Sequence, residues 1–567
     1  MELGISAKKR KRQRWGALQA ERSSWITQYQ EISDYLLPRT GRFFLTDRNV
    51  GTKRHNNILD DSGTNSLRIL AAGMMAGMTS PARPWFRLAT SDLELMEYEP
   101  VKLWLADVQQ LMRDVFARSN TYRALQQVYE ELGAYGTAAT VVDDDFDTVI
   151  WHTPLTAGEY CISTDARGQV NSLYREFEMT IEQIVEKFVY INGAFDWSVV
   201  EPAVKNQWDR HDLDSWRAVI HAIEPRAKRE YGKGDAKNMA WSSCYFEAGG
   251  NSDKFLRESG YKEFPVLAPR WNVAGGDIYG NGPAMEALGA IQQLQQEQLR
   301  KSQGIDYQTM PPLQMPTALA QKHADTLPGG VVYHDMSGPG SKITSLWDVR
   351  LDLSHLLADI QDVRARIRRS FYADLFMMIS GDNRATPATA REVAERHEEK
   401  LLMLGPTLQR MDNELLSPFI DLTFAKIVAA GILPTPPKEM QGNELKVEFI
   451  STLAQAQRAV GLGSIERMLG TVGAIAQAKQ STEPWDKIDV DQAIDRMSDM
   501  LGLDPSLIIA DDKVAIIRDQ RAQKQAQAQQ LAAAQQMAAT AKDMAAAPTG
   551  EQNALTDMMQ SLPQGVM

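Results

Sequence analysis

The side chains best suited to chemistry in this sequence do not have the spacing of a known catalytic motif. Gly338-Pro339-Gly340-Ser341-Lys342 contains the residue types of a phosphate-binding loop, but its glycines are wrongly spaced and prolines surround it. His397-Glu398-Glu399 continues with Lys400 and Leu401, so the second histidine of a zinc-protease helix is missing. No G-x-S-x-G nucleophile motif is present. These motifs therefore favour neither an enzyme nor a bound cofactor, and we expect a protein that is not an enzyme.

A cluster of aspartates could bind a divalent cation through carboxylate oxygens. Its members are Asp143, Asp144, Asp145 and Asp147. Glu178 could add a further carboxylate. Aspartate is also a residue that turns favour, and the flanking segments 138–142 and 148–152 alternate as the strands of a hairpin do. A solvated turn is the favoured interpretation, and a divalent-metal enzyme stays open as an alternative.

Two groups of basic residues could contact phosphates. For the run KKRKRQR at 8–14, a mobile, solvated arm is the favoured interpretation, because chain termini are commonly disordered. The second group is a set of arginines among aspartates at 348–369, which includes Arg364 and Arg368. This helical segment could line a channel, or it could form ion pairs between subunits. The sequence favours neither interpretation.

The composition is typical of a multidomain globular protein. The 567 residues exceed the roughly 250–300 at which one core stops growing, so we expect two or more domains. Hydrophobic residues make up 43% and charged residues 24%, which excludes a chain that is disordered throughout. The net charge of −12 excludes a uniformly basic nucleic-acid coat. Cys161 and Cys244 are too few for a disulfide framework or a cysteine zinc site, and a reducing compartment is expected.

Hydropathy predicts no membrane segment. No apolar run reaches the roughly 18–20 residues that span a bilayer, and the nearest candidate, 69–78, is half that length. A signal peptide is not expected, because no continuous apolar core follows the basic run. The sequence predicts a protein with no membrane partner that is soluble and cytoplasmic where it is made.

Apolar periodicity predicts a helical start followed by a β-rich region. Helices are expected over 15–37, 62–78, 99–116 and 122–133. From 137 to 272 the period changes to two, which indicates a mostly antiparallel β region. Its expected hairpins are 138–142 with 148–152, and 160–163 with 170–178. Thr180 to Gln183 is a capping box that begins a short helix.

Two long helices flank a Pro/Gly-rich insertion in the second half of the chain. They are expected over 283–304 and 352–378, each with one apolar seam and one charged or amide face. A loop at 379–388 precedes a helix to about 430, which Pro406 and Pro418 are expected to kink. The rest is predicted as a strand at 445–450, several short helices over 452–519, and an Ala/Gln-rich tail.

Three blocks of sequence resemble the head-to-tail connector, or portal, proteins of short-tailed bacteriophages. The first includes EISDYLLPRTGRF at 31–43, and the second includes LAAGMMAGMTSP at 70–81. The third runs from FYADLF at 371–376 through TAREV at 389–393 to ELLSP at 414–418. Together the blocks span about residues 15–430, which is most of the chain.

The resemblance implies an α+β fold of portal type, with a β-rich wing, two long stem helices, an inserted clip, a kinked long helix and an α-helical crown. The implied parts are a basic N-terminal arm (1–14), the wing (15–282), the stem (283–304 and 352–378) and the clip (305–351). They continue with a tunnel loop (379–388), the kinked helix and a strand returning to the wing (389–450), the crown (451–519) and the C-terminal extension (520–567). This extension is expected to be a helical barrel or disordered.

Portal proteins form a ring, usually of twelve subunits, at one capsid vertex. The resemblance implies that a separate terminase motor packages double-stranded DNA through the ring, that DNA later leaves through it, and that the tail docks on it. The implied partners are other copies of the chain, non-specifically bound DNA, the terminase large subunit, tail adaptor proteins, and the major capsid and scaffolding proteins. The implied location is the virion, with the host cytoplasm during assembly.

The resemblance also suggests site residues. The candidates for contact with DNA in the channel are Arg364, Arg368, Arg384, Asp382 and Asn383. The candidates for docking through the clip are Pro311, Pro312, Gly329, Tyr333 and Trp347. Another ring-forming virion protein, such as a tail hub or an internal ejection protein, is an alternative that the insertion between two long helices disfavours.

Overall fold

The computed structural model describes most of the chain, which divides into two compact units. Unit 1 comprises 1–91, 104–436 and 442–463, and unit 2 comprises 92–103, 437–441 and 464–567. The described residues are 6–44, 57–90, 92, 95, 98–191, 193–230, 232–250, 253–309, 313–314, 344–345, 354–380, 405–440, 445–449, 452–479, 481, 485, 487–501, 509 and 511–545.

The N-terminal part of the chain is helical, as predicted. Its helices are α1 (Ala7–Tyr35), α2 (Ser62–Met78), α4 (Glu99–Arg118) and α5 (Thr121–Tyr135). The bounds of α2 equal the predicted range. α5 packs closely on α2, because a Cβ at Gly133 would lie 2.7 Å from Leu67. Glycine is therefore required at this crossing.

Two antiparallel sheets form the β-rich part of unit 1. Among the described residues, one has the strand order β10-β9-β8-β5-β4 and the other β11-β2-β3. The first contains β4 (Tyr160–Thr164), β5 (Val170–Thr180), β8 (Trp216–Pro225), β9 (Trp241–Glu247) and β10 (Arg257–Tyr261). The second contains β2 (Ala139–Asp145), β3 (Val149–Leu155) and β11 (Val266–Leu267). Both predicted hairpins, β2–β3 and β4–β5, are confirmed.

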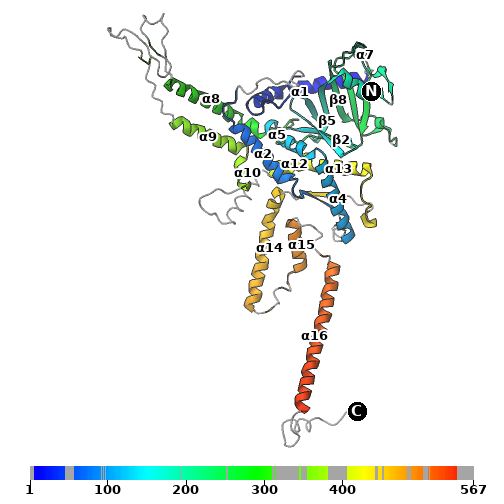
Figure 1. Cartoon of the computed structure of the whole chain (residues 1–567), viewed down its shortest axis with the longest axis vertical. Coiled ribbons are helices and arrows are strands. Elements are labelled where there is room, and N and C mark those ends of the chain that lie inside the picture. Colours follow the sequence, from blue (N-terminus) through cyan, green and yellow to red (C-terminus); the bar gives the residue numbers. More distant parts are fainter. Residues whose placement is uncertain are drawn as a thin grey trace. The chain divides into compact units, whose positions relative to one another are not determined.

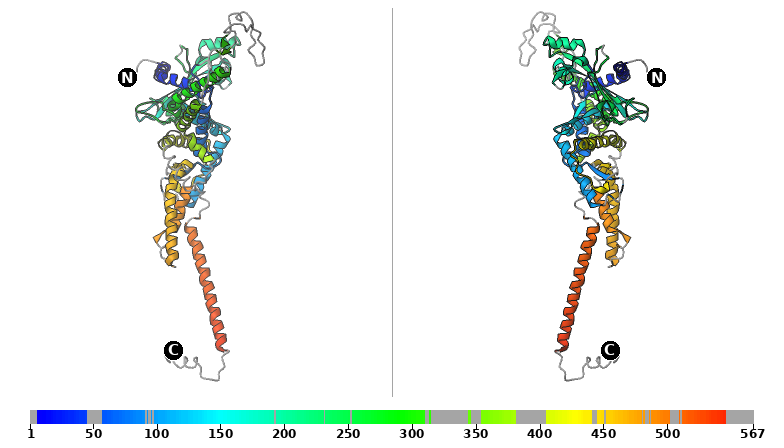
Figure 2. Two further views of the ribbon diagram at one scale, coloured as in Figure 1. Left: turned by 90° about the vertical axis from the view of Figure 1, so that its left-hand side faces the viewer. Right: turned by 90° about the vertical axis from the view of Figure 1, so that its right-hand side faces the viewer.

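Helix α1 lies against the larger sheet, as the blue helix beside the green strands shows in Figure 2. Trp15 and Leu18 pack into a core with Tyr174 of β5 and Phe246 of β9. The rings of Trp15 and Tyr174 stack with their centroids 6.4 Å apart. One side of the sheet is thereby buried by the first helix of the chain.

The predicted solvated arm is wrong for residues 7–14, which form the start of α1. Ser6 caps the helix by accepting a hydrogen bond from the N–H of Lys9. Lys8 and Lys11 are buried. Lys11 pairs with Glu224 of β8 at 2.6 Å. The prediction failed because carboxylates from distant parts of the chain neutralise these lysines. A run of charges in the local sequence does not reveal such partners.

A small group of elements is inserted between β5 and β8. It contains α6 (Ile181–Ile184), the π-helix η2 (Val185–Val189), β6 (Tyr190–Ile191), β7 (Ala194–Phe195), η3 (Trp197–Val199) and α7 (Pro202–Asp209). The predicted capping box at Thr180 and Gln183 is confirmed. A 3-10 turn, η4 (Ala236–Asn238), precedes β9.

A further strand pair joins segments far apart in the sequence. β1 (Phe86–Thr90) pairs antiparallel with β14 (Leu445–Phe449), with Phe86 opposite Phe449. The strand predicted at 445–450 is thereby confirmed, and both strands of the pair belong to unit 1.

The second half of unit 1 is mainly helical (Figure 1). Its elements are α8 (Pro283–Thr309), the paired strands β12 (Leu313–Gln314) and β13 (Thr344–Ser345), α9 (Ser354–Ser370), α10 (Ala373–Ser380), α12 (Gly405–Met411), the π-helix η6 (Asp412–Leu416) and α13 (Ser417–Ala430). The predicted helix 352–378 is in fact two helices, because the chain breaks at Phe371 and Tyr372. Pro418 lies in the first turn of α13, directly after the π-helix. Residues 389–404 of the predicted kinked helix lie outside the described residues.

The C-terminal helices are longer than predicted. α14 (Thr452–Lys479) is a single helix of 28 residues where several short ones were expected. It is followed by α15 (Val490–Leu501) and by α16 (Asp511–Ala545), whose described side chains are almost all exposed. The short turn η7 (Lys438–Met440) and an ion pair between Arg518 and Asp491 also belong to unit 2. In the described part of the chain, no helix is both long and apolar enough to cross a membrane.

Candidate functional site

The most distinctive element of unit 1 is the helical hairpin formed by α8 and α9. The chain leaves the β-rich part along α8 and returns along α9, so the helices are antiparallel (Figure 1). Their seam contains Leu288, Ile291 and Leu294 of α8, and Ile360, Val363 and Ile367 of α9, all of them buried. These positions recur at spacings of three and four, which is why each helix has one apolar stripe.

A buried aspartate fastens the segment before α2 to both helices of the hairpin. The Asp60 carboxylate accepts hydrogen bonds from Nη2 of Arg364 at 2.6 Å and from Nε2 of Gln298 at 2.9 Å. The amide oxygen of Gln295 accepts the backbone N–H of Asp60 at 2.8 Å. The Asp60 side chain is 4% exposed and that of Arg364 is 34% exposed. This cluster ties the segment before α2 to the middle of both helices.

The electrostatics of this cluster favour an ionised Asp60. Burial alone would raise the pKa of the carboxyl group, but hydrogen bonds from Ser62 and Arg364 and the charge of Arg364 outweigh burial. The pKa of Asp60 therefore lies below its ordinary value. Arg364 is thus engaged within its own subunit.

The outward face of α9 carries the other arginines. Arg366 donates a hydrogen bond to Gln293 and pairs with Asp362 at 3.3 Å. Arg368 and Arg369 are exposed, and neither guanidinium group has a partner among the described residues. Together with the exposed Arg300 of α8, they are cations that the described part of the hairpin presents to solvent for a phosphate.

The remaining predicted site residues are not located. Arg384, Asp382 and Asn383 of the expected tunnel loop lie outside the described residues, as do the docking candidates of the expected clip, Pro311, Pro312, Gly329, Tyr333 and Trp347. Sequence reasoning missed Asp60 and its two glutamine partners. A signal was present, because Gln295 and Gln298 lie at seam positions of α8, where a polar side chain needs a partner.

The base of the hairpin is a junction of several elements. Tyr372 separates α9 from α10 with a left-handed φ of 54°, and its ring centroid lies 6.1 Å from that of Trp271. The neighbouring Arg270 holds Glu414 of η6 through Nη2 at 2.7 Å and Nε at 3.1 Å. The backbone N–H of Arg270 also donates to Glu414. A bulky residue with positive φ is strained, and here packing and a buried ion pair hold it.

The aspartate cluster is used for structure. Asp145 accepts hydrogen bonds from the backbone N–H and hydroxyl groups of Thr148. Asp144 pairs with Lys426 at 2.5 Å, and Asp143 accepts a hydrogen bond from Tyr261. Glu178 lies on β5 of the other sheet. Within the described ranges, no group of three or more such ligands is arranged to hold a metal ion.

Comparison with known proteins decides what this architecture belongs to. A family model described as bacteriophage head to tail connecting protein matches residues 8–509. The chain belongs to this family. The resemblance seen in the three sequence blocks is thereby confirmed, and the description of the family points to a structural role.

Two curated relatives of the connector chain are similar over nearly their whole length. A probable portal protein of Bordetella phage BPP-1 is 56% identical over 549 residues, which cover 97% of each chain. A portal protein of Salmonella phage epsilon15 is 43% identical over 541 residues, which cover 95% of each chain. Among solved structures, a chain from the neck of an empty gene transfer agent particle aligns at 12% identity with a TM-score of 0.33. The alignment covers 73% of this chain and 86% of that one, and at this TM-score it carries no argument.

Proposed function

We propose that copies of this chain form a ring-shaped channel at one capsid vertex, through which double-stranded DNA is packaged and later ejected. The observation that carries the proposal is the α8–α9 hairpin in a chain of the connector family. Its seam residues are buried inside the hairpin, and its outward face carries charged and amide side chains together with the exposed Leu299 and Leu357. A heterologous arrangement of such subunits closes into a ring with a central hole.

The charges suit a channel in which DNA moves without sticking. The net charge of −12 makes most of a ring wall repel phosphate, so duplex DNA is not held. Arg368 is exposed on α9 and could contact the backbone transiently. We assign the same role to Arg384 in the loop 379–388, with Asp382 and Asn383 beside it. Arg364 could take part only by leaving Asp60.

Two features of the sequence suggest the other partners: the missing phosphate-binding loop and the insertion between α8 and α9. Since the sequence contains no phosphate-binding loop, a separate terminase must supply the packaging motor. We propose that the clip 305–351 docks this motor and later the tail adaptor, with Pro311, Pro312, Gly329, Tyr333 and Trp347 as contact candidates. The wing would face the major capsid and scaffolding proteins. The location is then the virion.

Negative-stain electron microscopy of the purified protein, combined with light scattering, tests the proposal. Rings with a central hole and a mass near 760 kDa, which is about twelve copies of 63.4 kDa, would support it. A neighbouring ring size would support it equally, since closure with one subunit more or fewer gives the same channel. A protein that stays a compact monomer or dimer, and that labelled antibodies do not find at a vertex of the virion, would contradict it.

A further inference from the structure

Strand β3 forms one edge of the smaller sheet, whose order among the described strands is β11-β2-β3. Alternate residues of an antiparallel edge strand point both of their backbone groups away from the sheet. In β3 these residues are Ile150, His152 and Pro154, since both backbone groups of His152 bond outside the sheet. A row of unpaired groups at an edge is a template on which another chain can pair.

The side chain of Asn120 occupies the middle of this edge. Its Nδ2 atom donates a hydrogen bond to the carbonyl oxygen of His152 at 2.7 Å. The backbone N–H of His152 donates to Oδ1 of Asn120 at 2.8 Å. A carboxamide carries donor and acceptor groups like those of a peptide group. Asn120 therefore occupies the two backbone groups that a neighbouring strand would use.

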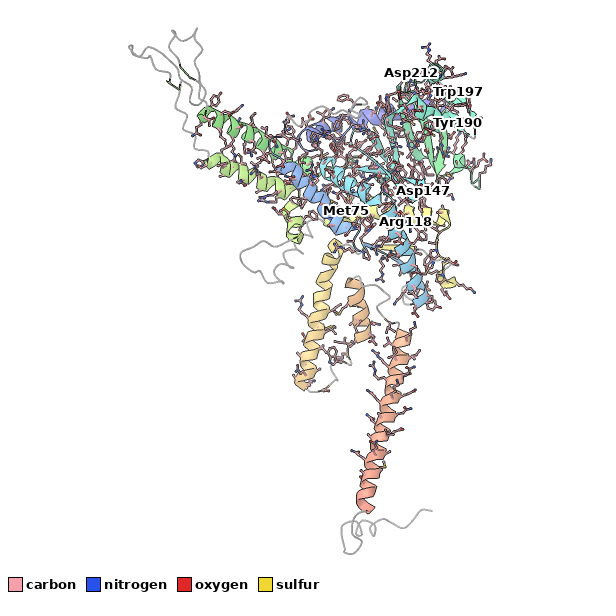
Figure 3. The ribbon with its side chains drawn as sticks, viewed as in Figure 1. Met75, Arg118, Asp147, Tyr190, Trp197 and Asp212 are labelled. Atoms are coloured by element: carbon pink, nitrogen blue, oxygen red, sulfur yellow. The ribbon has the colours of Figure 1, made fainter. Side chains whose placement is uncertain are left out.

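Asn120 does not serve its own helix in the usual way. It stands at the N-cap position of α5, in the connection that follows Arg118 of α4. Asparagine is favoured at this position because its side chain can accept a hydrogen bond from an N–H of the first turn, but the Asn120 side chain makes no such bond. In Figure 3, the labelled Arg118 and Asp147 mark the end of α4 and the turn before β3, the two segments that meet here.

The outward positions on either side of His152 are closed by other means. The hydroxyl oxygen of Thr148 lies 2.9 Å from the carbonyl oxygen of Ile150. Pro154 has no N–H to offer, and proline is one of the residues with which proteins interrupt pairing at an edge. Each of the three successive outward positions thus lacks a group that an added strand would use.

The edges of the larger sheet carry comparable contacts. On β4, Nη1 of Arg22 donates a hydrogen bond to the carbonyl oxygen of Tyr160. On β10, at the opposite edge, Nη2 of Arg226 donates to the carbonyl oxygen of Ser259 at 2.9 Å. Side chains thus bind outward backbone groups on the longer edge strands of both sheets.

We propose that Asn120 blocks the edge of β3 and so keeps this strand from pairing with a strand of another polypeptide. The strand that it excludes is β3 of a second copy, because two identical edges can align antiparallel with His152 at the centre. This role goes beyond the proposed ring and does not depend on it. It allows many copies to meet without joining their sheets.

A substitution in the full-length protein tests this role. Asn120→Ala removes both hydrogen bonds to His152. The matched control is Asp60→Asn, which also loses buried hydrogen bonds in unit 1 but leaves β3 untouched. At a fixed concentration, light scattering should find about tenfold more Asn120→Ala than Asp60→Asn protein in species larger than the wild type. The reason is that two backbone groups become available to an added strand.

Hydrogen exchange identifies the strand that associates. In dilute Asn120→Ala protein, the amide of His152 should exchange faster than in the wild type, because its acceptor is gone. In the associated fraction, the same amide should be protected again, because a strand of a second copy now accepts its hydrogen bond. A variant that is only less stable would show fast exchange in both fractions.

Thr148→Val supplies a second variant, which decides the question if Asn120→Ala does not fold. It removes the hydroxyl group beside Ile150 and keeps a branched side chain of similar size. We expect association in the same direction but to a smaller extent, again with protection of the β3 amides in the associated fraction.

The outcomes separate this inference from the proposed function. Folded Asn120→Ala protein that associates no more than Asp60→Asn, or that associates while the β3 amides still exchange rapidly, would overturn the blocking role. If only Thr148→Val folds, wild-type behaviour of that variant would overturn it. Failure of the wild-type protein to form rings would contradict the proposed function alone, because the variants are compared with whatever size the wild type has.

Discussion

At the scale of single residues, the hydrogen bonds of Asp60 should matter more than any exposed ion pair on the hairpin. Asp60→Asn removes the negative charge to which Arg364 of α9 and Gln298 of α8 donate hydrogen bonds. We expect the free energy of unfolding to fall by about 1–3 kcal/mol. The control is Asp362→Asn, because Asp362 pairs with Arg366 on the exposed face. We expect a change of at most about 0.5 kcal/mol there. Denaturant unfolding measures both, and equal effects would contradict the assignment.

The contribution of Asp60 should depend on pH with a definite sign. Because its folded-state pKa is lowered, the stabilisation is present above the unfolded pKa of about 3.9 and is lost as the pH falls through the folded value. The difference between the wild type and Asp60→Asn should therefore shrink in acid. A difference that stays constant down to about pH 3 would show that charge is not its origin.

Glu131 of α5 should have the opposite dependence. Burial raises the pKa of this carboxyl group to about 8, although Thr156 and Ala157 donate hydrogen bonds to it. Between the unfolded pKa of about 4.3 and about 8, the folded protein keeps a proton that the unfolded chain releases, so stability falls as the pH rises. Glu131→Gln imitates the protonated form and should remove that slope.

At about pH 8, Glu131→Gln should be more stable than the wild type by on the order of 5 kcal/mol, since the folded and unfolded pKa values differ by roughly 3.7 units and each unit corresponds to about 1.4 kcal/mol. Thermal unfolding from pH 5 to 9 measures the two slopes. The exposed Glu186→Gln serves as the control and should run parallel to the wild type. If the curve for Glu131→Gln also runs parallel to that of the wild type, the proton on Glu131 is not the origin of the slope.

At the scale of elements, glycines in two helices should respond in opposite directions to the same substitution. A Cβ at Gly73 of α2 would lie 2.2 Å from the Phe376 ring of α10, so Gly73→Ala should destabilise by about 1–3 kcal/mol. A Cβ at Gly16 of α1 would meet nothing within 4 Å, so Gly16→Ala should stabilise by about 0.5–1 kcal/mol. The midpoint of chemical unfolding reports both, and shifts of the same sign would contradict the packing of α10 on α2.

The elements that sequence patterns predicted well are those in which local signals agree. The helix 62–78 and the two β-hairpins were predicted because apolar spacing and turn residues mark the same boundaries. The break at Tyr372 was missed because the apolar period continues through it, and contacts with Trp271 decide it. The start of α1 was missed because Lys11 finds Glu224 more than 200 positions away. For the candidate site, Arg364 was named, but its partner Asp60 lies in another part of the chain.

At the scale of the whole molecule, the loop 379–388 should be dispensable for assembly and necessary for DNA. The predicted bounds are wrong for Ile379 and Ser380, which are the last residues of α10. The described hairpin seam ends before both, so deletion of 379–388 should leave rings of unchanged mass. Removing its charged side chains, Arg384 among them, should impair packaging or retention of DNA. Electron microscopy of rings and the DNA content of particles give the two readouts. Particles filled to the normal level would refute the role of this loop.

The insertion should have the complementary phenotype. Replacement of 311–345 by a short linker keeps α8 and α9 and should leave their seam intact. Binding of the packaging motor and of the tail adaptor should then be abolished, because both are proposed to dock there. Pull-down of each partner with wild-type and variant rings makes the comparison. Unchanged capture of either partner would exclude the insertion as its docking element.

The pairing of β1 with β14 also has a consequence for the way the chain is made. More than 350 residues separate Thr90 from Leu445, which lie opposite each other in this pair. At roughly 5–20 residues per second, the ribosome needs about 20–70 s to deliver the second strand after the first. During that interval β1, whose side chains are largely buried in the finished fold, has an unpaired edge. Nascent chains of this protein are therefore most prone to aggregate before residue 449 emerges, and chaperones should engage them in that interval.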